Sequence, residues 1–217
     1  MKHSEIEPEP AVAAQLCGSG LELVRQFARD LGTRGEELGL IGPDEPKRLW
    51  SRHILNCALL ATEIPHDGPA STRVSLADVG SGAGLPGLVI AMIRPDIEVT
   101  LIEPLERRTR WLGEQVESLG LTNVTVFTGR AEEFTPRRSF DVVTARAVRA
   151  LKGLIPLLAP LAMPGGKLLL LKGQQIDSEI ADATAAVERY KLTEVESRVL
   201  GVGTVDEPTR LFSAIVE

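Results

Sequence analysis

Residues 74–87 read VSLADVGSGAGLPG, an apolar run followed by a turn with four glycines in eight positions. The run Val74–Val79 has the length and composition of a buried strand, and the apolar residues Leu85 to Ile93 repeat at helical spacing. Glycine permits a sharp turn, and its lack of a Cβ lets the backbone approach a ligand at the start of the next helix. The stretch therefore predicts a strand, a glycine-rich ligand-binding turn and a helix.

The segments after this turn continue the alternation of strand and helix. Amphipathic helices are predicted around Leu105–Leu119, Leu151–Leu158 and Ile176–Tyr190, between apolar runs typical of buried parallel strands. Those runs are Val99–Ile102, Val124–Phe127, Val142–Val143 and Leu168–Leu171. Such βαβ units wind right-handed into one open sheet. The pattern is that of a Rossmann-like α/β fold.

Two further regions complete the predicted architecture. The last strand-like runs, Leu192–Leu200 and Arg210–Val216, are separated by a turn-rich stretch without a helix. We expect them to form an antiparallel hairpin at the edge of a mostly parallel, seven-stranded sheet. The region before residue 70 has helical periodicity instead. The chain is therefore divided into an N-terminal helical extension, residues 1–70, and a cofactor-binding domain, residues 71–217.

The composition excludes several classes of protein. The chain has 217 residues and a net charge of −6, so a global positive field for nucleic acid is not expected, although a local basic patch remains open. Its apolar runs are shorter than the ~18 residues of a membrane span, and the acidic N-terminus is unlike a secretory signal. The two cysteines, Cys17 and Cys57, lack metal-ligand spacing. We expect a cytoplasmic protein with no metal site and no membrane contact.

The glycines of the turn fit two cofactor classes. Gly82, Gly84 and Gly87 match the dinucleotide pattern G-x-G-x-x-G, whereas Gly80, Gly82 and Gly84 have the G-x-G-x-G spacing of methyltransferases. Asp78 favours the second class, because a carboxylate there would repel a pyrophosphate but can hold a cationic amino group. The methionine half of S-adenosylmethionine carries such a group. A simple turn or capping role is the alternative for Asp78.

Two acidic positions point to a nucleoside cofactor of either class. Glu103 ends the second predicted strand, where a carboxylate can accept both hydroxyl protons of a ribose. Its alternative role is that of an acid favoured by the dipole at the start of a helix. After the third strand, Gly129–Glu133 places a backbone N–H and an acid where they could meet the edge of an adenine, although an exposed helix start would look the same.

Basic residues at two places are candidates for binding RNA. Arg146 and Arg149 are expected near the start of a helix, where cations oppose the helix dipole unless an anion such as an RNA phosphate or the cofactor carboxylate compensates. A solvated charged face is the alternative. His53 beside Arg52, with Asn56 one turn on, could stack on or hydrogen-bond an extruded base. Equally, these residues could fix the helical extension to the sheet.

Several segments together resemble the bacterial 16S ribosomal RNA guanine-N7 methyltransferase family, also called the glucose-inhibited division protein B family. The matching segments are Arg52-His53 with Asn56, Asp78–Gly87, Gly129–Glu133, Phe140–Ala147 and Leu171–Gly173. Their order and spacing make the combination specific, and the likeness covers nearly the whole chain. The chain departs from the family at Ala145, where Ser is common, and at Asn56-Cys57, where Asp-Ser is common.

The resemblance implies a class I methyltransferase that transfers a methyl group from S-adenosylmethionine to N7 of one guanosine in the decoding region of 16S rRNA. The partner is then 16S rRNA or the small ribosomal subunit, and a monomer is the working expectation. By matching positions, the resemblance implies cofactor contacts at Gly80, Leu85, Ala131, Glu132 and Arg146. Asp78, Gly82, Gly84 and Glu103 complete the predicted cofactor site, and the candidates for RNA binding are Arg52, His53, Asn56, Arg149 and Lys172.

The chemistry of this reaction fits a site without a catalytic dyad. Guanine N7 has a lone pair and no proton, so its methylation requires placement in line with the methyl group and no general base. Arg146 is the candidate for positioning. One rival is a small-molecule methyltransferase with the same cofactor site. Another is an NAD(P)-dependent oxidoreductase, favoured by G-x-G-x-x-G but disfavoured by Asp78, and a non-enzymatic RNA-binding module is disfavoured by the acidic net charge.

Overall fold

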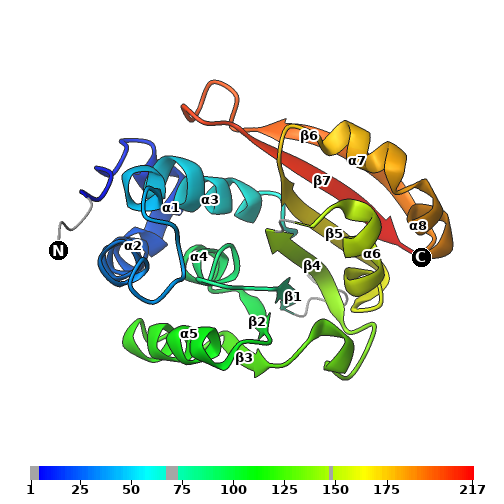
Figure 1. Ribbon diagram of the computed structural model, residues 1–217, viewed down its shortest axis with the longest axis horizontal. Coiled ribbons are helices and arrows are strands. Elements are labelled where there is room, and N and C mark those ends of the chain that lie inside the picture. Colours follow the sequence, from blue (N-terminus) through cyan, green and yellow to red (C-terminus); the bar gives the residue numbers. More distant parts are fainter. Residues whose placement is uncertain (1–4, 67–72, 147–148) are drawn as a thin grey trace.

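The computed structural model describes residues 5–66, 73–146 and 149–217, and its centre is an open sheet with helices on both faces (Figure 1). The sheet has seven strands in the order β3-β2-β1-β4-β5-β7-β6. They are β1 Val74–Val79, β2 Ile97–Glu103, β3 Val124–Thr128, β4 Phe140–Arg146, β5 Ala162–Lys172, β6 Leu192–Leu200 and β7 Thr209–Val216. The predicted Rossmann-like α/β class is confirmed.

The strand directions follow from the connections between the strands. The pairs from β3 through β5 are parallel and joined by crossover segments, whereas β7 is antiparallel to both β5 and β6. The predicted C-terminal hairpin is therefore confirmed, with its second strand inserted beside β5. After β1 the chain builds outward through β2 and β3, and it then returns to place β4 on the other side of β1. Ligands bind at such a reversal, beyond the carboxyl ends of the strands.

Two groups of helices cover the two faces of the sheet (Figure 1). On one side lie α1 Ala13–Cys17, α2 Leu21–Arg34, α3 Leu55–Ala61, α4 Gly87–Ile93 and α5 Glu106–Ser118. On the other side lie α6 Leu151–Leu158, α7 Ile176–Asp182 and α8 Thr184–Arg189. Each group packs on the sheet through its own cluster of buried apolar side chains. The single helix expected over Ile176–Tyr190 is divided at Ala183 into α7 and α8.

The N-terminal helices share the core of the sheet. Phe27 and Ile54, both 0% exposed, belong to the same apolar cluster as Leu88 of α4 and Leu101 of β2. The boundary proposed at residue 70 lies outside the described residues. The described part of the chain contains no helix that is both long and apolar enough to cross a bilayer.

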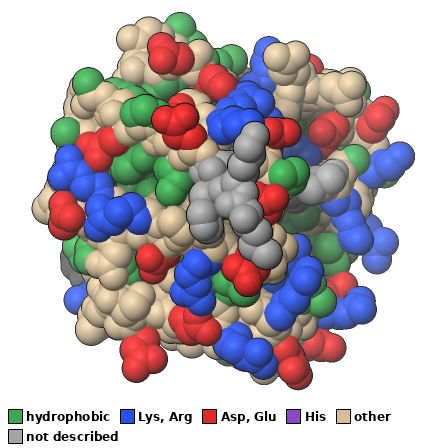
Figure 2. Space-filling view, turned by 60° about the vertical axis from the view of Figure 1, so that its left-hand side comes forward, with side chains coloured by type: hydrophobic (Ala, Val, Ile, Leu, Met, Phe, Trp, Pro, Cys, Tyr) green, Lys and Arg blue, Asp and Glu red, His purple; other side chains and the backbone are tan. Residues whose placement is uncertain are grey.

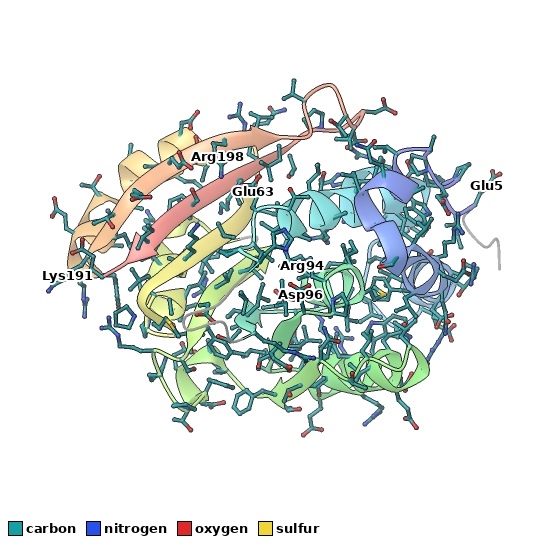
Figure 3. The ribbon with its side chains drawn as sticks, turned by 180° about the vertical axis from the view of Figure 1, so that it is seen from behind. Glu5, Glu63, Arg94, Asp96, Lys191 and Arg198 are labelled. Atoms are coloured by element: carbon teal, nitrogen blue, oxygen red, sulfur yellow. The ribbon has the colours of Figure 1, made fainter. Side chains whose placement is uncertain are left out.

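A buried arginine fastens the end of α3 to the loop that follows α4. The guanidinium of Arg94 donates hydrogen bonds to the carbonyl oxygens of Ala61, Ile64 and Pro65, and it forms an ion pair with Asp96 at 2.6 Å (Figure 3). Charge-assisted hydrogen bonds of this kind satisfy carbonyl groups left unpaired at a helix end. The contact holds the N-terminal helices against the sheet.

Strand β3 differs from the expectation that the strands of the sheet are buried. Its five residues are intermediate or exposed. The strand lies at the edge of the sheet and has a neighbour on only one side. A short apolar run carries no information on whether its strand is central or at an edge, so the sequence pattern did not distinguish the two.

Candidate functional site

The glycine-rich turn lies at the reversal of the strand order, between the end of β1 and the start of α4. Gly80, Gly82 and Gly84 have φ angles of 73°, 56° and 97°, a region that residues with a Cβ rarely adopt. The N–H of Gly80 donates to the carbonyl of Ile102 at 2.8 Å, so the turn crosses the carboxyl end of β2. Trp111 of α5 donates its indole N–H to the carbonyl of Ala83 at 3.0 Å and holds the turn from the helical side.

Two buried carboxylates bind the backbone of this turn. Oδ2 of Asp78 accepts the N–H of Gly87 at 3.0 Å. Oε2 of Glu103 accepts the N–H of Gly82 at 2.9 Å, and its Oε1 accepts the N–H of Leu105 at 3.1 Å. Asp78 is 0% and Glu103 is 1% exposed. The two acids therefore fix the shape of the turn by accepting hydrogen bonds from its backbone N–H groups.

A cavity of about 660 Å³ opens beside the turn, within the range of about 300–1,000 Å³ typical of small-molecule sites. The predicted site residues that line it are Gly80, Gly82, Leu85, Ala131, Glu132, Arg146 and Arg149. Gly84, Asp78 and Glu103 are not among its lining residues. The structure thus brings together the turn, the segment after β3 and the end of β4.

Arg108, one of three neighbouring arginines that the sequence offered as candidates for the mouth of the pocket, also lines the cavity. Other lining residues were not singled out from the sequence, and they are Leu40, Val79, Ser81, Ala83, Ile102, Pro104, Arg130, Leu154 and Leu157. Most of them directly neighbour a predicted position. Their place at the carboxyl ends of β1, β2 and β3 could have identified them from the sequence, because ligands bind at this edge of a parallel sheet. Leu40 comes from the N-terminal region, and no local pattern indicates that it would reach the cavity.

Arg146 is the last residue of β4, which corrects the expectation that it lies at the start of a helix. Helix α6 begins five residues later, at Leu151. The guanidinium of Arg146 donates through Nη1 to Nδ1 of His53 at 2.5 Å, and Nε2 of His53 donates to the carboxylate of Glu45. Because His53 is 6% exposed, its ring presents little surface for stacking on a base. The contact joins the helical extension to the sheet, as one of the two alternatives anticipated.

The other RNA-binding candidates differ in their exposure. Arg52 and Arg149 are exposed. Asn56 donates from Nδ2 to the carbonyl of Arg52 at 2.8 Å. The side chain of Lys172 is 3% exposed and forms an ion pair with Glu179 at 2.7 Å. Lys172 also donates to the carbonyl of Arg149 at 2.9 Å, so it holds the loop before α6.

On the face drawn in Figure 2, the surface charge is mixed rather than separated. Over the face drawn in Figure 2, Lys and Arg side chains are interspersed with Asp and Glu side chains. This pattern agrees with the net charge of −6. Any attraction of an anionic partner must then come from local cations, such as Arg146 and Arg149 at the cavity.

The buried Asp78 carboxyl makes stability depend on pH. Burial raises its pKa to about 7 from an ordinary value of 3.8. The folded chain therefore holds this proton over a pH range in which the unfolded chain releases it, and the resulting stability is complete below about pH 4 and is lost as the pH rises through 7. With about 1.4 kcal/mol for each unit, the difference reaches at most about 4 kcal/mol.

Asp78→Asn should remove this dependence, since the amide does not ionise. Relative to wild type, the variant should gain stability steadily between pH 4 and pH 8. Urea unfolding of both proteins at several pH values measures the difference, and subtracting the two curves cancels the titration of all other groups. A difference that stays constant across this range would contradict the assignment.

The family model and the curated relatives agree on one family, and the solved structures share its fold. A family model described as rRNA small subunit methyltransferase G matches residues 20–205. The "Ribosomal RNA small subunit methyltransferase G" of Clavibacter sepedonicus is 50% identical over 215 residues, which cover 99% of both chains. A solved S-adenosylmethionine-dependent methyltransferase from Aquifex aeolicus shares the fold, with a TM-score of 0.57 at 20% identity over 80% of this chain and 95% of that one. P. horikoshii TYW2 in complex with MeSAdo gives a TM-score of 0.60 at 13% identity, over 76% of this chain and 62% of that one.

Proposed function

This chain belongs to the rRNA small subunit methyltransferase G family, and we propose that it transfers a methyl group from S-adenosylmethionine to N7 of a guanosine in the decoding region of 16S rRNA. The observation that carries the proposal is the match to this family along nearly the whole chain, including every segment that forms the cavity. The partner is 16S rRNA or the small ribosomal subunit, and the protein works in the cytoplasm. It acts as a monomer, and residues 71–217 form its cofactor-binding domain.

The residues around the cavity fit S-adenosylmethionine. A Cβ built on Gly80 would meet nothing within 4 Å, so the turn exposes bare backbone on its open side. Leu85 and Ile102 offer apolar surface suited to an adenine ring, and Glu132 and Arg146 add opposite charges at the edge. Arg146 can pair with the carboxylate of the methionine half, and Glu132 belongs to the segment expected to meet the edge of the adenine.

The reaction requires the chain to orient the cofactor and the guanine, and it does not require a proton transfer. Bound S-adenosylmethionine supplies a methyl group activated by the positive sulfonium. The glycine turn and the segment after β3 line one side of the cavity. The positively charged guanidinium of Arg146 lines it at the end of β4. Because guanine N7 carries no proton, no residue has to act as a base, and proximity and alignment provide the acceleration. Nothing in the comparisons favours a small-molecule methyltransferase or an oxidoreductase.

Glu103→Ala should weaken cofactor binding by about 1–3 kcal/mol, the range for charge-assisted hydrogen bonds. We propose that the carboxylate binds the ribose hydroxyls, and it also holds the N–H of Gly82 in the turn. Calorimetry with S-adenosylmethionine measures the effect. The matched control is Glu106→Ala, an exposed acid in the first turn of α5, which should bind the cofactor normally. Equal affinity of the two variants for S-adenosylmethionine would show that Glu103 is only a residue at the start of a helix and does not bind the ribose.

The RNA assignment has a direct test. Ribosomal RNA from a strain that lacks this chain should have lost one 7-methylguanosine of 16S rRNA. The purified protein with S-adenosylmethionine should restore it to small subunits or to their RNA. Retention of the modified base in the deleted strain would reject the ribosomal substrate while leaving the cofactor assignment intact.

A further inference from the structure

A chain of three side chains links the N-terminal segment to the cavity. Glu45 lies in a 3-10 helix, Glu45–Arg48, and His53 lies in a π-helix, Leu49–Ile54, that leads into α3. Arg146 ends β4, 93 positions further along the chain than His53. Nε2 of His53 donates to the Glu45 carboxylate, and Nδ1 accepts from Arg146 at 2.5 Å.

The hydrogen bonds define a single form of the imidazole. A nitrogen that accepts from a guanidinium must carry a lone pair, because arginine has donors only. His53 is thus neutral, with its proton on Nε2. Burial first, and then the positive charge of Arg146, lower the pKa of His53 to about 4, while Glu45 acts in the opposite direction and Arg52 in the same one. The neutral form therefore persists at physiological pH.

The histidine itself is firmly placed. Oε2 of Glu7 accepts the N–H groups of Trp50 and Ser51 at 2.8 and 2.9 Å, at the first turn of the π-helix. The N–H of Glu7 donates to the carbonyl of Pro46 at 2.9 Å. These contacts fix the backbone of the segment between Glu45 and His53.

The Glu45–His53 pair orients the side chain of Arg146. Within the described residues its guanidinium makes no other side-chain hydrogen bond than the one to His53, and it lines the cofactor cavity. An arginine has several flexible torsions, and ordering such a side chain costs up to about 2 kcal/mol of rotamer entropy. A hydrogen bond donated to a rigid, buried ring offsets this cost before the substrate arrives.

We propose that Glu45 and His53 are positioning residues, which hold the Arg146 guanidinium toward the cavity and set the rate of methyl transfer without touching substrate. This inference rests on the function proposed above. It gives His53 a role other than base recognition, and it adds Glu45, which no sequence pattern singled out.

A double-mutant cycle separates this role from a merely structural one. His53→Leu should lower the turnover of RNA methylation about tenfold in the wild-type background, and less than twofold when Arg146 is already alanine. Ile54→Ala, a buried neighbour on the same π-helix, is the matched control. Its effect on turnover should be the same with and without Arg146. A His53→Leu effect of equal size in both backgrounds would overturn the proposal.

A conservative replacement and a spectroscopic measurement complete the test. Glu45→Gln keeps an acceptor oxygen and should recover most of the turnover that Glu45→Ala loses. An equal loss of turnover in the two variants would overturn the positioning role of Glu45. Nitrogen-15 NMR, with His53→Gln for assignment, should show a neutral ring protonated on Nε2 at pH 7. A proton on Nδ1 would overturn the geometry. This NMR result is independent of activity, so an inactive wild-type enzyme would reject the proposed function and not the hydrogen-bonded chain of Glu45, His53 and Arg146.

Discussion

Arg146→Ala should lower the turnover of RNA methylation by about 100-fold, the scale set by the 1.5–3 kcal/mol of a hydrogen bond to a charged group. The side chain lines the cavity at the end of β4, where the proposed function places an anionic group of the cofactor or of the RNA. We therefore expect the loss to affect catalysis far more than folding. Single-turnover methylation of small subunits at saturating cofactor measures it.

The effect of Arg146→Ala on stability should be small but not zero. The substitution leaves Nδ1 of the buried His53 without its donor, which costs about 1 kcal/mol and lowers Tm by about 2–4 °C in a chain of this size. Arg198→Ala is the control, because Arg198 pairs with Glu63 at 2.7 Å and is not among the residues lining the cavity. It should methylate at the wild-type rate. Normal activity of Arg146→Ala would remove this residue from the mechanism.

Gly87→Ala should destabilise the fold and impair cofactor binding together. A Cβ at this position would lie 2.3 Å from Cδ2 of Leu101 and 2.9 Å from Cβ of Asp78, so α4 would have to move away from β1 and β2. Overpacking of this kind costs about 1–3 kcal/mol, or more where backbone must shift. The movement also breaks the hydrogen bond from Gly87 to Asp78 that closes the turn.

The measurements for Gly87→Ala are thermal unfolding and calorimetry with S-adenosylmethionine. Tm should fall by about 2–12 °C, and cofactor affinity should fall with it. Gly113→Ala provides the matched control, since a Cβ there meets nothing within 4 Å inside helix α5. It should stabilise the chain by up to about 1 kcal/mol. A Gly87→Ala protein as stable as wild type would show that close packing of α4 on the sheet is not required.

The positions of the strands and of the glycine turn were predictable because they depend on local pattern. The predicted strands Val74–Val79 and Leu192–Leu200 have the observed bounds, and the turn begins at Gly80 as expected. The glycine spacing also has a physical counterpart, because three of the glycines have positive φ. The helix–strand contact at Gly87 shows that both glycine patterns were meaningful, one for turn geometry and one for packing.

The contacts of individual site residues were less predictable. Asp78 and Glu103 are predicted to contact the cofactor, and in the structure both also bind backbone N–H groups of the turn, which for Asp78 is the alternative role anticipated from the sequence. A carboxylate at the end of a strand has the same sequence pattern in either role. Lys172 was grouped with RNA-binding cations, but its charge is paired with Glu179 from α7. The difference lies in which partner the fold brings within reach.

The amino-acid sequence by itself determined the α/β alternation, the glycine-rich turn and the family, because periodicity, glycine spacing and motif order are properties of neighbouring residues. Only the tertiary structure decided that Leu40 reaches the cavity and that Glu45 and His53 hold Arg146. Those contacts join residues far apart in the chain. Their geometry depends on how the N-terminal helices pack against the sheet, and that packing arises from the whole apolar core rather than from any local segment.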